Sequence, residues 1–353
     1  MTKMKKAASL LCIVAILIIS TSLFGCESKT EKFSEYSFDY FDTVTSIVGY
    51  AKSEEEFKTV AKDVLTSLEE YHKLYTIYER YEGINNICTI NALVNGEHQE
   101  LTVDKRIIDL LKYAKEQYYK TDGKLNVAMG SVLSIWHEYR EDALADPSNA
   151  KLPPKELLEE AAKHTSIEDL IINETASTVY LSNPKMTLDV GAIAKGYAVE
   201  MIVSALEARN VKGYVINVGG NVRTLGARAD GTPWQVGIEN PDKKSDKPYL
   251  EVLGLEGRSL VTSGSYQRYF TVENKNYHHI IDPETLMPSE LYTSVSIVTK
   301  SSALGDVLST ALFSMSIEDG KALIASLKDT EAMWVKVSGE TVYSKGFSEY
   351  ISE

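Results

Sequence analysis

Residues 189–200 read Asp-Val-Gly-Ala-Ile-Ala-Lys-Gly-Tyr-Ala-Val-Glu, a stretch that leaves an apolar strand and opens a helix. Its many small residues let another group approach the backbone closely, and the N–H groups of a helix N-terminus attract phosphate. Lys195 adds positive charge at this point, and Asp189 can accept hydrogen bonds from a heterocycle or a ribose hydroxyl. The alternative is an ordinary helix entry with Asp189 as its N-cap.

The sequence on either side of this stretch predicts helices mixed with antiparallel strands. Apolar residues recur at helical spacing, and the helices are expected at 54–80, 105–120, 129–139, 192–208 and 303–315. β-branched and aromatic residues favour strands at 38–50, 214–217, 234–238, 249–253, 269–272, 278–281 and 294–298, and a hairpin within 170–190. There is no internal repeat and no strict βαβ alternation. We therefore expect an α+β fold, a single large domain of mixed, largely antiparallel sheets flanked by helices.

The first residues have the pattern of a secretory lipoprotein signal. Lys3, Lys5 and Lys6 precede an apolar run over 7–24 that closes on Gly25-Cys26. An uncleaved transmembrane anchor is the alternative, but about 18 apolar residues are near the lower limit for spanning a bilayer. We expect a signal peptide at 1–25, lipid on Cys26 with a polar tether at 26–37, and the folded domain at 38–353.

Cysteine content and charge limit the class of protein. Of the three cysteines, Cys12 would leave with the signal and Cys26 would carry lipid, so Cys88 has no partner for an intrachain disulfide. Removal of residues 1–26 takes away three lysines and leaves 34 basic and 50 acidic residues, a net charge near −16. Nucleic acid is an unsuitable partner for such a chain. An anionic cofactor would need a divalent cation to bridge it to protein carboxylates.

Two further stretches carry groups that can contact a ligand. Gly219-Gly220-Asn221 ends a buried strand in a turn where the backbone can meet a ligand or simply reverse direction. Residues 260–270 gather hydroxyls, among them Ser263, with the guanidinium of Arg268 around Gly264. This set can hold a phosphate or a ribose.

Residues 277–284 read Tyr-His-His-Ile-Ile-Asp-Pro-Glu and place two histidines on an expected strand. Alternation sends the rings of His278 and His279 to opposite faces, so only one of them should reach a given site. Asp282-Pro283 is a turn that can bring a carboxylate near the same cavity. A satisfied structural role for either histidine is equally compatible with the sequence.

Asp306 and Thr310 lie four residues apart at the start of an expected helix and therefore share one face. Both offer oxygen, the ligand type that Mg²⁺ prefers, and phosphates and water would complete an octahedron. A chance pairing on the helix is the simpler alternative. The sequence contains no Cys/His set with zinc spacing, no Walker motif and no GxSxG elbow.

Taken together and in this order, these stretches resemble the ApbE family of FAD:protein FMN transferases, whose members are often lipoproteins. The resemblance covers nearly the whole chain after the signal. The stretches that carry it are 41–46, 121–126, 189–200, 219–221, 262–264, 278–283 and 306–310.

The resemblance implies a set of site residues. Mg²⁺ would be held by Asp306, Thr310 and the backbone carbonyl of Ala192, while His279 would act as base, with His278 in reserve, and Asp282 would orient that region. The residues implied to contact FAD are Phe41, Lys124, Leu125, Asn126, Asp189, Lys195, Gly220, Ser263 and Arg268. The family commonly has methionine at the position of Phe41 and aspartate at that of Asn126.

The resemblance also implies the reaction and its partners. A threonine or serine hydroxyl of an acceptor attacks the FMN phosphorus of FAD, AMP leaves, and FMN stays on the acceptor as a phosphoester. The acceptors would be exported or membrane flavoproteins with an Asp-x-x-(Ser/Thr)-Gly-Ala-Thr site, and the enzyme would be lipid-anchored at the extracytoplasmic face of the cell membrane. Two rival functions are an FAD pyrophosphatase, in which water attacks, and a non-catalytic solute-binding lipoprotein.

Overall fold

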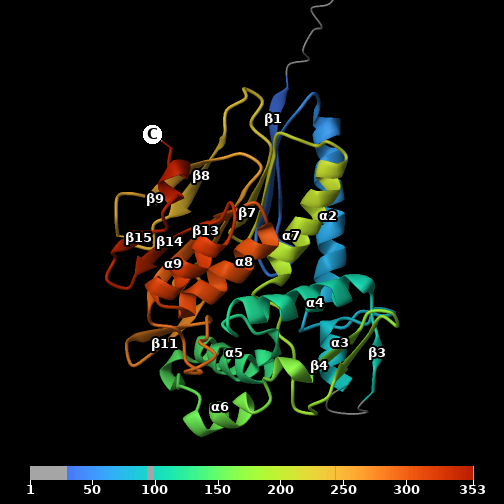
Figure 1. Cartoon of the computed structure of the whole chain (residues 1–353), viewed down its shortest axis with the longest axis vertical. Coiled ribbons are helices and arrows are strands. Elements are labelled where there is room, and N and C mark those ends of the chain that lie inside the picture. The colour runs from blue at the N-terminus through green and yellow to red at the C-terminus, as the bar shows by residue number, and fades with distance from the viewer. Residues whose placement is uncertain (1–29, 94–98, 243, 353) are drawn as a thin grey trace, which may run out of the picture.

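The computed structural model describes residues 30–93, 99–242 and 244–352. Within these ranges the largest sheet has eight strands in the order β1-β2-β6-β7-β10-β13-β14-β15, and every neighbouring pair is antiparallel (Figure 1). These strands are β1 (Glu31–Ser37), β2 (Thr45–Ala51), β6 (Tyr214–Val218), β7 (Asn221–Leu225), β10 (Ser259–Gly264), β13 (Tyr292–Thr299), β14 (Glu331–Lys336) and β15 (Thr341–Tyr343). The predicted α+β class with largely antiparallel sheets is confirmed.

Three small antiparallel sheets accompany the large one. They are formed by β3 (Leu101–Thr102), β4 (Leu170–Asn173) and β5 (Thr178–Leu181), by β8 (Trp234–Glu239) and β9 (Tyr249–Leu255), and by β11 (Tyr269–Val272) and β12 (Lys275–His278). The hairpin expected within 170–190 is therefore present as β4 and β5.

The helices differ from the prediction mainly where they are short. They are α2 (Glu54–Tyr75), α3 (Ile87–Leu93), α4 (Lys105–Lys120), α5 (Gly130–Ala145), α6 (Lys155–Ala162), α7 (Ala194–Ala208), α8 (Ser302–Ala311) and α9 (Ile317–Ser326). The bounds of α4 are those predicted. α3 and α6 were not predicted, because seven and eight residues give too few turns for a helical period to stand out.

The segment expected to be a polar tether is the edge strand β1, so the prediction of a tether over 31–37 was wrong. All seven of its residues pair with β2, from Glu31 opposite Ala51 to Ser37 opposite Thr45. Phe33 stacks on Phe57 of α2 with ring centroids 5.7 Å apart. One apolar side chain among polar ones is a weak sequence signal, and pairing with β2 supplies the rest of the stabilisation. The folded domain therefore begins at least seven residues before the predicted start at 38.

The helix α2 ends at Tyr75, five residues before the predicted end at 80. Its N-terminus is capped as expected for such a sequence, since the Ser53 side chain accepts from the Glu56 N–H and three glutamates follow. At the other end the fully buried Asn86 donates from Nδ2 to the carbonyls of Lys73 and Glu79. These two hydrogen bonds hold residues 76–79 outside the helix, although the spacing of the apolar residues predicts that the helix continues.

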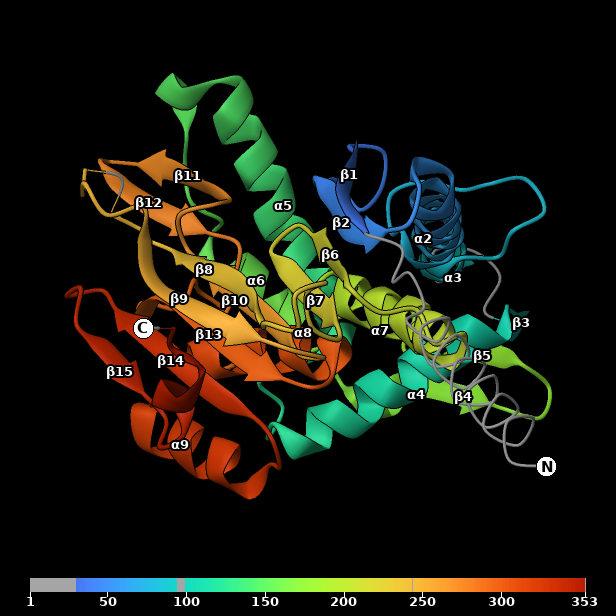
Figure 2. The same ribbon diagram turned by 90° about the horizontal axis from the view of Figure 1, so that it is seen from above.

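The large sheet is covered on its two faces by different elements. α2 and α7 pack on β2 and β6 through an apolar cluster that includes Ile47, Leu68, Val199 and Ile216. α8 lies against β10 and β13 on the same side, while β8 and β9 cover the opposite face of β10, β13 and β14 (Figure 2). The start of β7 therefore lies beside the N-terminus of α8, and the end of β10 lies beside the last turn of the same helix.

The strand expected at 278–281 is displaced by three residues, because β12 ends at His278. It is the second arm of a tight hairpin in which Glu273 and Asn274 take φ values of 50° and 65°, the signs that a two-residue hairpin turn requires. His279 consequently follows the strand, and the alternation argument for the two histidines no longer applies to it.

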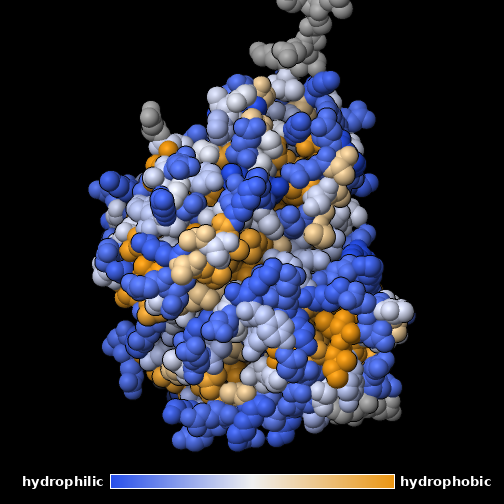
Figure 3. Space-filling model, in the orientation of Figure 1, coloured by the Kyte–Doolittle hydropathy of each residue, from blue (hydrophilic) through white to orange (hydrophobic). Residues whose placement is uncertain are grey.

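The exterior in the orientation of Figure 3 is mostly hydrophilic, with apolar side chains in small separate groups. No helix among the described residues is long and apolar enough to cross a bilayer. The predicted signal peptide and Cys26 lie outside the described residues.

Candidate active site

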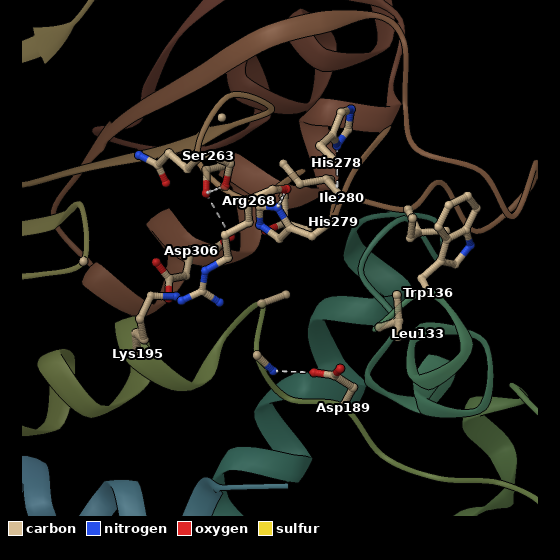
Figure 4. A pocket seen from close by; sticks show the side chains of 18 of the residues that line it. Leu133, Trp136, Asp189, Lys195, Ser263, Arg268, His278, His279, Ile280 and Asp306 are labelled. Carbon is tan, nitrogen blue, oxygen red and sulfur yellow. Dashed lines mark hydrogen bonds and ion pairs between the residues drawn. The ribbon is translucent and has the colours of Figure 1, made fainter. Parts of the chain in front are cut away.

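A cavity of about 630 Å³ lies between α7, α8 and β10 on one side and α5 with β11 and β12 on the other (Figure 4). It brings together residues from eight separate stretches of the chain, the first near residue 42 and the last near residue 310. The predicted site residues that line it are Lys124, Leu125, Asn126, Asp189, Ala192, Lys195, Gly220, Ser263, Arg268, His278, His279, Asp306 and Thr310. Phe41 and Asp282 do not line it, although their neighbours Asp42 and Pro283 do.

Asp306 is a buried carboxylate at the wall of this cavity, only 4 % exposed. Its Oδ1 accepts from Asn221 Nδ2 at 2.8 Å, and its Oδ2 accepts from the Gly196 N–H at 2.6 Å. The Lys195 ammonium lies 4.0 Å from Oδ2. Each carboxylate oxygen keeps a second lone pair, so the group is held in one orientation and can still bind a cation.

Asn221 fixes this corner by joining β7 to the start of α8. Its Nδ2 also donates to the Ser302 carbonyl at 3.3 Å, and its Oδ1 accepts from the Ser302 hydroxyl. The Ser302 N–H in turn donates to Glu200 of α7 at 2.6 Å. A buried network with every member satisfied holds its geometry firmly.

Two cations face the same part of the cavity as Asp306. Lys195 is the second residue of α7, and Arg268 comes from the segment between β10 and β11 (Figure 4). The Arg268 Nη2 donates to the Asp42 carbonyl at 3.2 Å, so the guanidinium has one fixed anchor and its other donors can meet a ligand. Two cations with a guanidinium fork suit an anionic phosphate group.

Hydroxyl groups complete this side of the cavity. Ser263 on β10 donates to the Ser309 hydroxyl at 2.9 Å, and Ser309 donates to the Asp306 carbonyl. Thr310, one turn of α8 beyond Asp306, also lines the cavity. The predicted helical pairing of Asp306 with Thr310 is thus present.

The two histidines differ in which ring nitrogens are engaged. His278 is buried, and its Nε2 contacts the Ser289 carbonyl at 2.7 Å while its Nδ1 accepts from the Ile280 N–H at 3.2 Å. Both nitrogens of His278 are therefore committed to the backbone. Burial also lowers the pKa of His278.

His279 is exposed to the cavity and has a nitrogen available there. Its Nδ1 lies 3.2 Å from the Arg268 carbonyl, which can only accept, so Nδ1 carries the proton. Nε2 has no hydrogen-bond partner within the described ranges. Surrounding protein atoms on the other sides, with the cations Arg268 and Lys195, lower the pKa of His279 to about 3. The ring is therefore neutral at pH 7, with a lone pair on Nε2.

Asp282 has a structural task near the cavity. Its Oδ1 accepts from the Glu284 N–H at 3.1 Å and from the Lys124 ammonium at 3.2 Å. Glu284 lies 2.8 Å from the same ammonium. Lys124 is thereby neutralised by two carboxylates, which leaves Lys195 and Arg268 as the cations better placed for an anion.

Several other predicted contact residues are engaged in packing or turns. Phe41 packs between the two largest apolar clusters. Leu125 is 2 % exposed, and Asn126 uses its side chain to accept from Ala128 and to donate to Thr165. Gly220 has φ of 87° in the turn between β6 and β7, a conformation that favours glycine.

Asp189 is not the N-cap of α7. That helix begins at Ala194 after Ile193, and no side chain caps it. Asp189 Oδ1 accepts from the Gly191 N–H at 2.8 Å instead, and burial raises its pKa. The carboxyl group lines the cavity, where Figure 4 shows it apart from Lys195 and Asp306 and turned toward the Gly191 N–H.

One side of the cavity is aromatic, and it was not predicted from the sequence. Leu133 and Trp136 of α5 line it together with Phe270, and Trp136 donates from Nε1 to the Leu286 carbonyl at 2.9 Å. At the mouth, Tyr78 lies against His137 with ring centroids 5.3 Å apart. The spacing of Leu133 and Trp136 is visible in the sequence, but it fits core packing equally well.

The donor set fits a small, hard cation. Asp306 offers a carboxylate and Thr310 offers a hydroxyl. Ala192 also lines the cavity and offers a backbone carbonyl. In the part of the chain that the structure describes, no group of three or more His, Cys, Asp or Glu side chains is placed to hold a metal ion. A cation at Asp306 would therefore need phosphate and water oxygens as further ligands, as Mg²⁺ commonly has.

Comparison with known proteins gives a consistent result. The FAD:protein FMN transferases of Klebsiella pneumoniae and Treponema pallidum are 30 % identical over 282 residues and 31 % identical over 294 residues. The first match covers 77 % of this chain and 84 % of the relative, and the second covers 79 % of each.

Solved structures share the fold. The ApbE protein of Thermotoga maritima superposes with a TM-score of 0.78 at 26 % identity and covers 92 % of this chain and 100 % of its own. The flavin transferase ApbE of Vibrio cholerae gives 0.74 at 23 % identity, covering 91 % and 99 %, and shows the fold alone. A model of the ApbE family matches residues 41–334, which span all the cavity segments described above. This protein belongs to the ApbE family.

Proposed function

We propose that this protein transfers FMN from FAD to a threonine or serine hydroxyl of an acceptor protein, in a Mg²⁺-dependent reaction that releases AMP. The observation that carries the proposal is the meeting of Asp306, Lys195, Arg268 and the unengaged Nε2 of His279 in one cavity. The names of the two relatives quoted above support the same activity.

The cavity has two chemically different sides, which suits a dinucleotide. Cations and hydroxyls gather around Asp306, whereas Leu133, Trp136 and Phe270 form an apolar wall. Aromatic ring systems of FAD match the apolar wall, and the pyrophosphate matches the cations. A volume of about 630 Å³ lies in the range of pockets that hold such ligands.

Asp306, Thr310 and the carbonyl of Ala192 would hold Mg²⁺ in this scheme. A bound Mg²⁺ supplies charge neutralisation and orientation for the phosphoryl oxygens. The chain contributes a carboxylate that two hydrogen bonds keep in a fixed orientation, so little reorganisation is needed when the substrate arrives.

His279 is the proposed general base. Its Nε2 takes the proton of the acceptor hydroxyl while that oxygen bonds to the FMN phosphorus and the bond to the AMP oxygen breaks. A pKa of about 3 is low for a base, but it describes the protein without an anion. A pyrophosphate next to Arg268 adds negative charge near the imidazole ring. This charge raises the pKa of His279 toward the pH at which the enzyme works.

Two rival functions use the same cavity differently. A pyrophosphatase would let water replace the acceptor hydroxyl and release free FMN, while a solute-binding lipoprotein would bind without turnover. Neither requires an acceptor protein, and the second requires neither the Nε2 of His279 nor a cation at Asp306.

One experiment separates the three. The full-length protein is incubated with FAD, Mg²⁺ and a protein that carries an Asp-x-x-(Ser/Thr)-Gly-Ala-Thr site, and the acceptor's intact mass is measured together with AMP. Transfer predicts a covalent FMN adduct and equimolar AMP. AMP and FMN without adduct would establish hydrolysis, and unchanged FAD would support binding alone. The proposal is abandoned if Asp306→Ala leaves Mg²⁺-dependent AMP release intact.

The cellular site of the reaction is part of the proposal. Lipid on Cys26 would anchor the enzyme at the extracytoplasmic face of the membrane, so acceptors would be exported or membrane flavoproteins. Labelled palmitate or intact-mass analysis of the cellular protein tests this, because Cys26→Ala should abolish both lipid and cleavage before residue 26.

A further inference from the structure

Phe41 and Asp42 form an unusual turn beside the cavity. They are consecutive non-glycine residues with φ values of 57° and 49°, both in the left-handed region. A side chain disfavours that region because its Cβ crowds the neighbouring carbonyl. Two such residues in a row persist only where their surroundings hold them in place.

His72 of α2 holds this turn from outside the cavity. Its Nδ1 accepts from the Phe41 N–H at 3.2 Å, and the Phe41 ring meets the imidazole edge-on at a centroid distance of 5.6 Å. An N–H donor fixes Nδ1 as the unprotonated nitrogen, so Nε2 carries the proton and faces the Tyr81 hydroxyl at 3.5 Å. Tyr81 in turn donates to Glu79 at 3.0 Å.

The turn is fixed at its other end as well. Thr43 packs so closely against Gly219 that a Cβ added to Gly219 would lie 2.3 Å from the Thr43 hydroxyl oxygen. The Gly219 N–H donates to the Val44 carbonyl at 3.1 Å. Because the turn is held at both ends, the Asp42 carbonyl is fixed in orientation. It accepts a hydrogen bond from Arg268 Nη2 at 3.2 Å.

We propose that His72 is a positioning residue for substrate binding. It keeps Phe41 and Asp42 in the left-handed conformation, and the Asp42 carbonyl then holds the Arg268 guanidinium where the FAD pyrophosphate binds. His72 itself does not line the cavity. This inference rests on the proposed function, because it assigns Arg268 to that substrate.

Steady-state kinetics of His72→Phe test the inference. The phenyl ring keeps the shape but offers no acceptor, so the turn relaxes and Arg268 loses its anchor. KM for FAD should rise about tenfold, the value of one hydrogen bond to a charged group, with kcat changed less than about threefold. His72→Asn is the matched control, because its Oδ1 can take the place of Nδ1, and its KM should stay within about threefold of the wild type.

A double-mutant cycle distinguishes positioning from a general structural defect. In an Arg268→Ala background, His72→Phe should change KM less than about twofold, because the group that it positions is already gone. Asp42→Gly combined with His72→Phe should recover most of the lost affinity, since glycine adopts positive φ without strain. Thermal melting of each variant confirms that it is folded.

The outcomes separate this inference from the proposed function. The positioning role is wrong if the wild type transfers FMN and His72→Phe has the same KM for FAD. It is also wrong if the changes in KM caused by His72→Phe and Arg268→Ala simply multiply in the double variant. If the wild type transfers nothing, the proposed function fails. FAD binding measured by flavin fluorescence then still tests His72 alone, with about tenfold weaker binding expected for His72→Phe.

Discussion

The backbone N–H of Gly196 donates to Asp306 Oδ2 at 2.6 Å, although the two residues lie 110 positions apart in the chain. The contact is possible because α7 and α8 meet at a residue without a side chain. A Cβ on Gly196 would lie 2.5 Å from the Ser302 carbonyl oxygen and 2.7 Å from Asp306 Cγ. The glycine thus serves helix packing and the orientation of the proposed metal ligand at once.

Gly196→Ala should disturb both the packing of α7 against α8 and the orientation of Asp306. The added methyl group forces α7 away from α8, which should lower the free energy of unfolding by about 1–3 kcal/mol and weaken the apparent affinity for Mg²⁺ in AMP release. Thermal melting and a Mg²⁺ titration measure the two effects. Gly254→Ala is the matched control and should resemble the wild type. The nearest atom to a Cβ added at Gly254 is the Ser352 hydroxyl oxygen at 3.3 Å. Unchanged Mg²⁺ dependence in a folded Gly196→Ala protein would contradict the role given to this contact.

Replacement of the two histidines should have different consequences. His279→Gln removes the proposed base and should lower kcat for FMN transfer by about 10²–10⁴, with FAD binding changed little. His278→Gln disturbs a buried ring bonded to Ser289 and Ile280, so it should lower stability by about 1–3 kcal/mol and affect kcat less. Single-turnover kinetics and melting curves give both quantities. The reverse pattern would reassign the base to His278.

The pH dependence of the reaction should report the charge around His279. In the free enzyme the pKa is depressed to about 3, so the neutral form persists as pH falls through the usual histidine range near 6.5. The acidic limb of kcat/KM due to His279 should therefore lie far below pH 6. Bound FAD raises the pKa by its negative charge, so the acidic limb of kcat should lie at higher pH than that of kcat/KM. Coincident limbs would argue against a phosphate beside this ring.

Removal of β1 should destabilise the protein. A chain that starts at residue 38 loses the pairing with β2 and the stacking of Phe33 on Phe57, and burial of one such side chain contributes about 1.5–3 kcal/mol. Urea unfolding should show a midpoint lower than that of a chain that starts at residue 30. Equal midpoints would mean that the strand contributes no stability and that the domain starts where the sequence alone predicted.

The fold class, most of the longer elements and most of the stretches that line the cavity could be predicted from the amino-acid sequence. Periodicity over 105–120 gave α4 with its observed bounds, since sixteen residues repeat the apolar spacing several times. The motifs around Asp189, Ser263 and Asp306 could be found because small, hydroxyl and acidic residues in fixed order restrict the chemistry locally. Local signals fail for β1 and for the end of α2, where Phe33 and Asn86 depend on partners elsewhere in the chain.

The roles of the individual site residues follow from the folded structure and not from the residue pattern. It committed both nitrogens of His278 to the backbone, left the Nε2 of His279 without a partner in the described part of the chain, and paired Lys124 with Asp282 and Glu284. These outcomes depend on distances between groups that are remote in sequence. Hydrogen bonds and ion pairs act over a few ångströms, so residue type and spacing can nominate a side chain, and packing assigns its role.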